Sequence, residues 1–178
     1  MATEQKSALN IVMGAMTFGK EGAEGARVHT IDGVSAILDV FQKHGHTEAS
    51  LLIDTARTYT GGSSEEFLGE VGWQQRGLKM ETKLYPNVSG SRYSGTLKIS
   101  HSPEDLRKFL DISLETLKTD SVDIWYLHAP DRTTPYEVTF KAVNELYKEG
   151  KFKRLGISNY MSWEVAEIVG ICKANGYI

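Results

Sequence analysis

The chain alternates short β-rich runs with longer helical runs, and this order constrains its fold more than any other feature. The β-rich runs are expected at 11–18, 51–54, 78–85, 122–127 and 155–158. Each is followed by a run whose apolar residues recur at helical spacing. Alternation of this kind predicts parallel strands joined by right-handed helical crossovers. Two α/β architectures suit about five such units: an open doubly wound sheet, or part of a (β/α)₈ barrel.

The helical runs show which faces should be buried. Helices are expected at 31–44, 65–71, 103–118, 136–148 and 163–174. The first carries Val34, Ile37, Leu38 and Phe41 on one face, and the last carries Val165, Ile168, Val169 and Cys172 on one stripe. These residues are predicted to face the core.

Start signals precede two of the helices. Ser63 or Ser64 is expected to cap the helix at 65–71. The helix at 103–118 has Ser102 at the N-cap, Pro103 at the first helical position and Asp105 at the capping-box spacing. Residues 88–99, rich in Ser and Gly, are expected to form a long loop. Among the tryptophans, Trp125 is expected in the core, Trp73 on the surface and Trp163 as an anchor of the last helix.

Composition excludes several classes of protein. The 178 residues include 20 Lys+Arg and 23 Asp+Glu, which gives a formal net charge of -3. A weakly acidic chain lacks the basic face that nucleic-acid binding needs. No apolar run is long enough for a membrane span, and the first residues lack a signal-peptide layout. The single cysteine, Cys172, fits a reducing compartment. We therefore expect one cytoplasmic domain over residues 1–178.

Polar side chains fall where the predicted strands end. Asp54, Lys83, His128, Ser158 and Asn159 lie at or beside four strand ends, and Tyr59 lies five residues beyond Asp54. In a barrel these ends share one rim, which carries the active site. In an open sheet the same edge is the ligand side, but residues from four strands would spread further apart.

Tyr, Lys, Asp and His together would form an acid–base group if they converge. An ammonium beside a phenol lowers the pKa of the phenol, and a carboxylate holds that ammonium in place. An imidazole can hydrogen-bond and orient a substrate oxygen. The set suits protonation of a carbonyl oxygen while hydride reaches the carbon, and the hydride must come from a cofactor. No convincing metal-ligand pattern is present.

The chain carries several motifs at or near the predicted strands and helix starts. In order, they are IDTA at 53–56 with Tyr59, SEEFLG at 64–69, TK at 82–83, SPEDLR at 102–107, DIWYLHAP at 123–130 and GISNY at 156–160. This series resembles that of the aldo-keto reductases, and most closely the aflatoxin-aldehyde-reductase branch. Any one of these motifs is weak, but their order and their strand positions make the match specific.

The resemblance implies a (β/α)₈ barrel that binds NADPH and reduces an aldehyde or ketone to an alcohol. Tyr59 would be the general acid, Lys83 would lower its pKa and Asp54 would pair with Lys83. His128 would orient the carbonyl of the small-molecule substrate. Ser158 and Asn159 would hold the nicotinamide carboxamide, beside Asp54 at the cofactor. Asn159 or Ser158 capping the last helix is the alternative structural reading.

The family barrel has eight βα units, and this chain has about five, so the resemblance also implies a barrel cut after its fifth unit. Two alternatives to a working reductase follow. One is a truncated product without activity of its own. The other is a catalytically inactive partial barrel that acts as a binding or regulatory module, for example by pairing with a second copy through its open edges.

Overall fold

The computed structural model describes residues 11–44, 51–88 and 98–178, which fall into two compact units, Met1–Glu81 and Thr82–Ile178. The predictions for the first ten residues, and most of the loop expected at 88–99, lie outside the described residues. Strand β3 (Lys79–Leu84) runs from the first unit into the second. Each unit is described below by itself.

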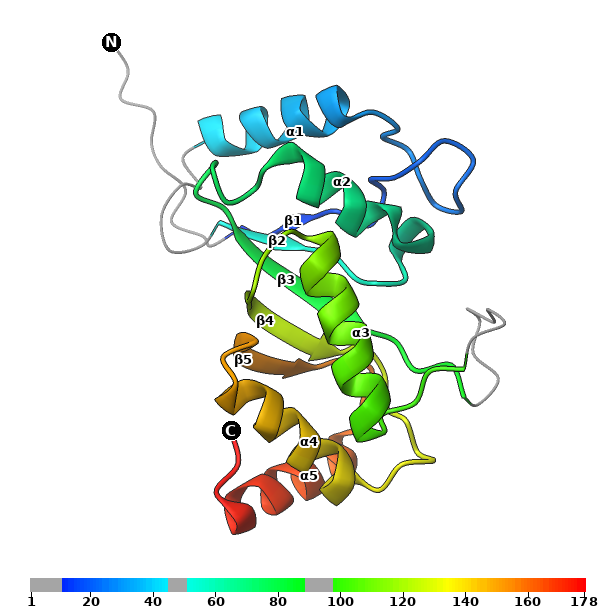
Figure 1. Cartoon of the computed structure of the whole chain (residues 1–178), viewed down its shortest axis with the longest axis vertical. Coiled ribbons are helices and arrows are strands. Elements are labelled where there is room, and N and C mark those ends of the chain that lie inside the picture. Colours follow the sequence, from blue (N-terminus) through cyan, green and yellow to red (C-terminus); the bar gives the residue numbers. More distant parts are fainter. Residues whose placement is uncertain (1–10, 45–50, 89–97) are drawn as a thin grey trace. The chain divides into compact units, whose positions relative to one another are not determined.

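In the first unit, two helices lie beside three parallel strands (Figure 1). Its further elements are β1 (Met13–Gly14), α1 (Ile31–Lys43), β2 (Leu52–Asp54), the 3₁₀ turn η1 (Tyr59–Gly62) and α2 (Ser63–Val71). Strand β1 pairs with β2, and β2 pairs with β3, so that the Cα of Asp54 lies opposite that of Glu81. The predicted parallel pairing is confirmed, although β1 is much shorter than the β-rich run at 11–18.

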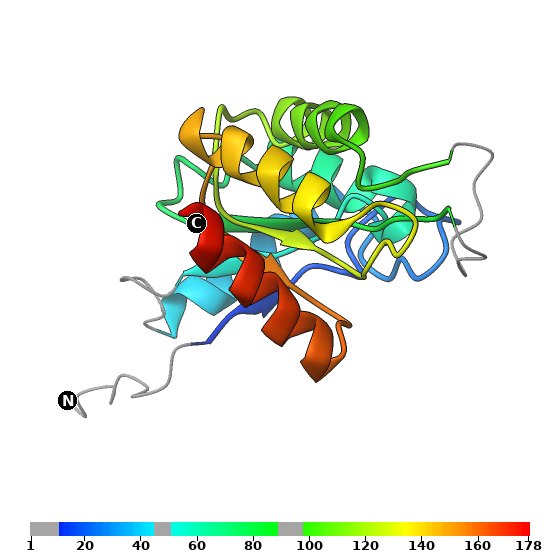
Figure 2. The ribbon, with the colours of Figure 1, turned by 90° about the horizontal axis from the view of Figure 1, so that it is seen from below.

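In the second unit, three helices lie beside the strands (Figure 2). Its elements are α3 (Pro103–Thr116), β4 (Val122–Leu127), α4 (Tyr136–Lys148), β5 (Phe152–Ile157) and α5 (Ser162–Asn175). Strands β4 and β5 are parallel, α3 packs on α4, and α4 packs on α5. The bounds of β4 and α4 match the prediction. Strand β5 begins three residues before the expected Leu155, because Phe152 is buried and starts the pairing with Val122.

The helix starts confirm one predicted cap and correct the other. The Ser102 side chain accepts from the N–H of Asp105, and Pro103 takes the first helical position. The Asp105 carboxylate instead accepts from the N–H and hydroxyl of Ser100. Ser63 and Ser64 do not cap α2, because the helix begins at Ser63 itself, directly after η1, and Gly62 is the N-cap.

The observed burial shows which of the predicted helix faces are packed in the core. Val34, Leu38 and Phe41 are buried on α1, as expected. On α5 only Ile168 of the predicted stripe is buried, while Val165 and Val169 are 37% and 44% exposed. The helix is apolar around much of its surface, so a stripe read from the sequence did not identify its packed side.

The burial of two of the three tryptophans differs from the prediction. Trp125 is in the core, as expected. Trp73 is buried and not on the surface, because the left-handed Gly72 ends α2 and turns the chain back. Trp163 is 60% exposed and does not anchor α5. None of the helices in the described ranges combines the length and hydropathy of a membrane span.

Candidate functional site

In the first unit, Asp54 and Tyr59 lie where β2 leaves the sheet. Asp54 is the last residue of β2, and its carbonyl accepts from the N–H of Ala15 at 2.8 Å. The next residue, Thr55, donates its N–H to the carbonyl of Glu81 at 3.0 Å. Tyr59 begins η1 and is half-buried. The strand pairing therefore continues one residue past β2 and fixes the start of the segment that carries Tyr59.

Buried hydroxyl groups hold both sides of that segment. The hydroxyls of Thr55 and Ser64 are 2.8 Å apart, and Ser64 donates to the carbonyl of Ala15 at 2.8 Å. The hydroxyl of Thr60, directly after Tyr59, donates to the carbonyl of Phe18 at 2.7 Å. A buried polar group without a hydrogen-bond partner destabilises the folded state. These bonds therefore favour a single conformation of the segment.

An ion pair lies beside the same segment. The guanidinium of Arg57 contacts the buried carboxylate of Glu65 at 2.5 Å. Gly62 has a left-handed φ of 96°, and a Cβ there would fall on the Arg57 guanidinium. Glycine is therefore required on two grounds, backbone conformation and space.

In the second unit, Lys83, His128 and Ser158 lie at the carboxyl ends of three successive strands. Lys83 is the penultimate residue of β3, two residues after Glu81. His128 directly follows β4, and its N–H donates to the carbonyl of Leu84 at 2.8 Å. Ser158 directly follows β5, and its N–H donates to the carbonyl of Leu127 at 3.0 Å. The structure thus brings these three predicted site residues to one edge of β3, β4 and β5.

The imidazole of His128 is neutral at physiological pH. Burial and, to a smaller extent, the nearby positive charge of Lys83 together lower its pKa to about 4. The rings of His128 and Tyr85 are nearly perpendicular, with ring centroids 5.3 Å apart. A neutral imidazole can donate or accept a hydrogen bond without carrying charge, which suits orientation of a carbonyl oxygen.

Tyr126 and Gly156 contribute to the surroundings of Lys83, and the sequence analysis did not assign either a role. The ammonium of Lys83 lies 5.7 Å from the centroid of the Tyr126 ring, within range of a cation–π contact. A Cβ at Gly156 would fall 2.2 Å from carbons of that ring. The signal was available, because a glycine inside a strand indicates close approach of another group.

Asn159 links two strand ends. Its Nδ2 donates to the carbonyl of His128 at 2.7 Å and contacts the hydroxyl of Ser158 at 3.1 Å. The capping alternative is wrong for both residues, because α5 begins at Ser162 with Met161 at the N-cap. An exposed amide beside a half-buried hydroxyl supplies donors and acceptors of the kind that a carboxamide group requires. These two residues therefore fit the nicotinamide end of a dinucleotide.

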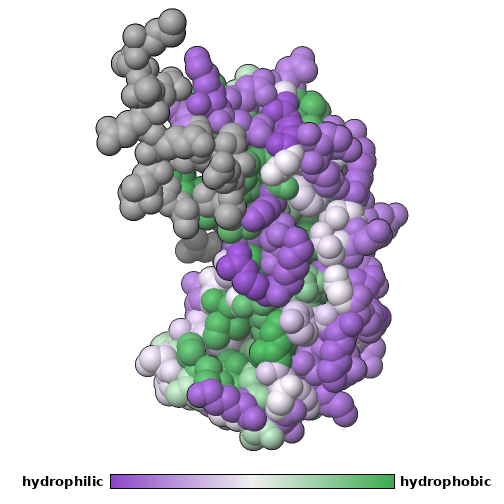
Figure 3. Space-filling view, turned by 90° about the vertical axis from the view of Figure 1, so that its left-hand side faces the viewer, coloured by the Kyte–Doolittle hydropathy of each residue, from purple (hydrophilic) through white to green (hydrophobic). Residues whose placement is uncertain are grey.

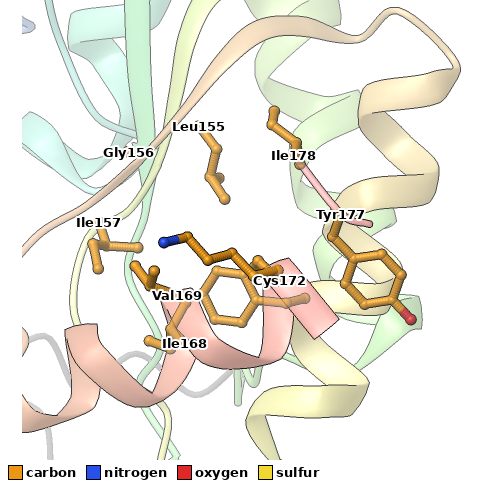
Figure 4. Close-up of a pocket in the computed structure, with 10 residues that line it drawn as sticks. Leu155, Gly156, Ile157, Ile168, Val169, Cys172, Tyr177 and Ile178 are labelled. Carbon is orange, nitrogen blue, oxygen red and sulfur yellow. The ribbon is translucent and has the colours of Figure 1, made fainter. Parts of the chain in front are cut away.

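A cavity in the second unit lies between α4, β5 and α5. It measures about 370 Å³. Leu155, Ile157 and Val169 point into the same space (Figure 4). Figure 3 shows hydrophobic atoms gathered on this part of the chain. Its lining is apolar except for Cys172, Lys173 and Tyr177, and it contains none of the predicted site residues, so we do not assign the reaction to it.

His101 is a buried titratable group directly before the N-cap of α3. Within the described ranges neither ring nitrogen has a hydrogen-bond partner. Its backbone N–H donates to the carboxylate of Asp131 at 2.8 Å. Burial lowers the pKa of the imidazole to about 4, and the charge of Asp131 opposes that shift only in part. His101 is therefore neutral in the folded chain at neutral pH.

We expect the folded state to lose stability as pH falls through the range between pH 6.5 and 4. The unfolded chain, with an ordinary histidine pKa near 6.5, binds a proton there that folded His101 does not. The full effect, reached below pH 4, is roughly 3 kcal/mol. Urea unfolding at pH 7 and pH 5 measures a part of it. His101→Gln should weaken the dependence, whereas exposed His44→Gln should not. Equal dependence in both variants would contradict the assignment.

Comparison with known proteins identifies the family. The model of the aldo/keto reductase family matches residues 10–178. The aldo-keto reductase pigE of Monascus ruber is 43% identical over 174 residues, covering 97% of this chain and 50% of that protein. The human aflatoxin B1 aldehyde reductase member 4 is 43% identical over 148 residues, covering 81% of this chain and 41% of that protein. The chain belongs to the aldo/keto reductase family.

Solved structures agree with this family and its barrel fold. The glycerol dehydrogenase of Gluconobacter oxydans matches with a TM-score of 0.69 and 25% identity, over 90% of this chain and 47% of that one. A thermostable aldo-keto reductase in complex with the inhibitor epalrestat matches with a TM-score of 0.67 and 26% identity, over 90% and 53%. The predicted barrel type is thus confirmed over an open sheet. The chain spans about half the length of the relatives it matches.

Proposed function

We propose that the chain carries the acid–base residues of an NADPH-dependent carbonyl reductase that converts an aldehyde or ketone to an alcohol. The observation that carries this proposal is the position of Asp54, Lys83, His128 and Ser158, each at the carboxyl end of its own strand. In barrels of this type the reacting groups are drawn from those ends. Membership of the aldo/keto reductase family supports the same reaction.

Each residue has a separate part in the proposed reduction. NADPH, when bound, supplies the hydride that reaches the carbonyl carbon. Tyr59 gives its phenolic proton to the carbonyl oxygen, so that the C=O group becomes a CH–OH group. The positive charge of Lys83 stabilises the phenolate that remains, and the carboxylate of Asp54 balances that charge.

The second unit supplies the orienting groups of this proposal. Neutral His128 hydrogen-bonds the substrate oxygen and directs it toward the proton donor. The hydroxyl of Ser158 and the amide of Asn159 bind the carboxamide of the cofactor, which fixes the reacting face of the nicotinamide. No cluster of three potential metal-ligating side chains occurs among the residues that the structure describes, and the proposed reaction needs none.

Oxidation of NADPH by the purified chain tests the proposal. With an aromatic aldehyde present, we expect NADPH absorbance to fall and the corresponding alcohol to form in equal amount. Reaction without the aldehyde is the control. Absence of both cofactor oxidation and alcohol product would reject reductase activity for this chain.

As a second prediction, two copies of the chain pair to form a dimer. It is favoured by the exposed Val165 and Val169 of α5, next to the apolar cavity. Chromatography with light scattering measures the mass in solution, and a clean monomer would reject the pairing.

A further inference from the structure

Glu164 is a buried carboxylate in the first turn of α5 that the proposed reduction does not use. Its Oε1 accepts from Nε of Arg132 at 2.8 Å and from the hydroxyl of Tyr136 at 2.5 Å. Its Oε2 accepts from Nη2 of Arg132 at 3.0 Å and from the N–H of Met161 at 2.7 Å. Burial raises the pKa of Glu164, but these donors outweigh that effect and hold it below its ordinary value. A charged group therefore lies at the centre of this network.

The donors come from two segments of the chain, one that runs from the β4–α4 loop into α4 and one in the loop before α5. Arg132 belongs to the loop between β4 and α4, and Tyr136 is the first residue of α4. Met161 ends the short loop between β5 and α5. At their strand ends the same two loops are joined by the bond from Asn159 Nδ2 to the carbonyl of His128. The loop that carries Ser158 and Asn159 is thus fixed to its neighbour at both ends.

Asn159 has a left-handed φ of 62°. Asparagine enters this conformation more readily than other non-glycine residues, but the conformation still costs free energy, so contacts that hold the neighbouring chain stabilise it. Met161 lies two residues beyond Asn159, so the bond from Met161 to Glu164 restrains the chain on the far side of the strained residue.

We propose that Glu164, held by Arg132 and Tyr136, is a positioning residue that keeps Asn159 in its left-handed conformation and so aims the Asn159 amide at the cofactor. This inference rests on the proposed function for its consequence in catalysis. The structural part, restraint of residues 158–161, stands on the contacts alone.

A simple capping role for Glu164 makes a different prediction. A capping box accepts Gln as well as Glu, so Glu164→Gln would leave a mere cap intact. The Glu164→Gln substitution does, however, remove the negative charge that pairs with Arg132. Tyr136→Phe removes one bond of the network and leaves the cap untouched. The exposed Glu167 of α5 provides the matched control, Glu167→Gln.

Hydrogen exchange measured by NMR on the full chain without cofactor is the first readout. We expect exchange of the Ser158 amide, bonded to Leu127 in the native state, to be about tenfold faster in Glu164→Gln and in Tyr136→Phe. Glu167→Gln should match the wild type. Unchanged exchange of the Ser158 amide in both network variants would overturn the inference. It would do so even if the free energy of unfolding of these variants were lower than that of the wild type.

Kinetics give the second readout. We expect KM for NADPH to rise about tenfold in Glu164→Gln, with kcat at saturating NADPH within about threefold of the wild type. A fall in kcat with unchanged KM would overturn the positioning role. If the wild-type chain does not reduce carbonyls at all, the proposed function fails, and the exchange experiment still decides whether Glu164 restrains the loop.

Discussion

Tyr59→Phe is expected to lower the turnover of carbonyl reduction by about two to four orders of magnitude. The variant keeps the aromatic ring and removes the hydroxyl that would protonate the carbonyl oxygen, and loss of a general acid has effects of this size. The neighbouring bonds of Thr60, Ser64 and Thr55 do not involve the phenol, so the segment should keep its conformation. Steady-state NADPH oxidation with an aromatic aldehyde gives the rate.

Tyr147→Phe is the matched control for this variant. Tyr147 lies on α4 and is 40% exposed, outside the predicted site. Its loss of a hydroxyl should leave turnover unchanged. An equal rate in Tyr59→Phe and the wild type would remove Tyr59 from the acid role. Equal losses in the two variants would point to a general effect of removing a phenol, and would contradict the assignment in the same way.

Trp125→Ala is expected to destabilise the second unit by about 3–5 kcal/mol, the usual cost of truncating a buried aromatic residue. Trp125 is 1% exposed on β4, and its ring packs on that of Phe152 with centroids 5.4 Å apart. Alanine would leave a cavity beside the ring of Phe152, at the start of β5. Urea unfolding monitored by circular dichroism measures the loss.

Trp163→Ala tests the same chemical change on the surface. Trp163 is 60% exposed at the start of α5, so its truncation should change the free energy of unfolding by about 0.5 kcal/mol or less. A loss in Trp163→Ala as large as that in Trp125→Ala would mean that the exposed face of α5 is packed in solution. It would contradict the assignment of Trp125 as the core residue of the pair.

Much of the secondary structure could be predicted from the sequence, because the local signals were strong. The alternation of strand and helix, the bounds of β4 and α4, and the start of α3 at Ser102 and Pro103 all followed from periodicity and capping chemistry. The start of α2 did not follow. The first turn of α2 continues from η1. The hydroxyl of Ser63 donates to the carbonyl of Thr60. The hydroxyl of Ser64 donates to the carbonyl of Ala15, which is distant in the sequence.

The candidate site divides in a similar way. Asp54, Lys83, His128, Ser158 and Asn159 were expected at strand ends, and that placement is confirmed. Their chemical roles remain predictions. The sequence carried a signal for Gly156 as a glycine inside a strand, but not for its partner Tyr126. Tyr126 and Glu164 entered only with the structure, because their contacts join residues roughly thirty or more positions apart. No short-range pattern in a sequence encodes such a pair.

The order of the residues by itself determined the alternation of strands and helices, and with it the edge at which reactive side chains gather. These properties depend on backbone preferences and on apolar spacing within a few residues. Only the tertiary structure decided that His101 and Glu164 are buried and that Asn159 adopts a left-handed conformation. Burial and strain depend on which distant segments pack around a residue, and that packing sets the free energy of each charge and each dihedral angle.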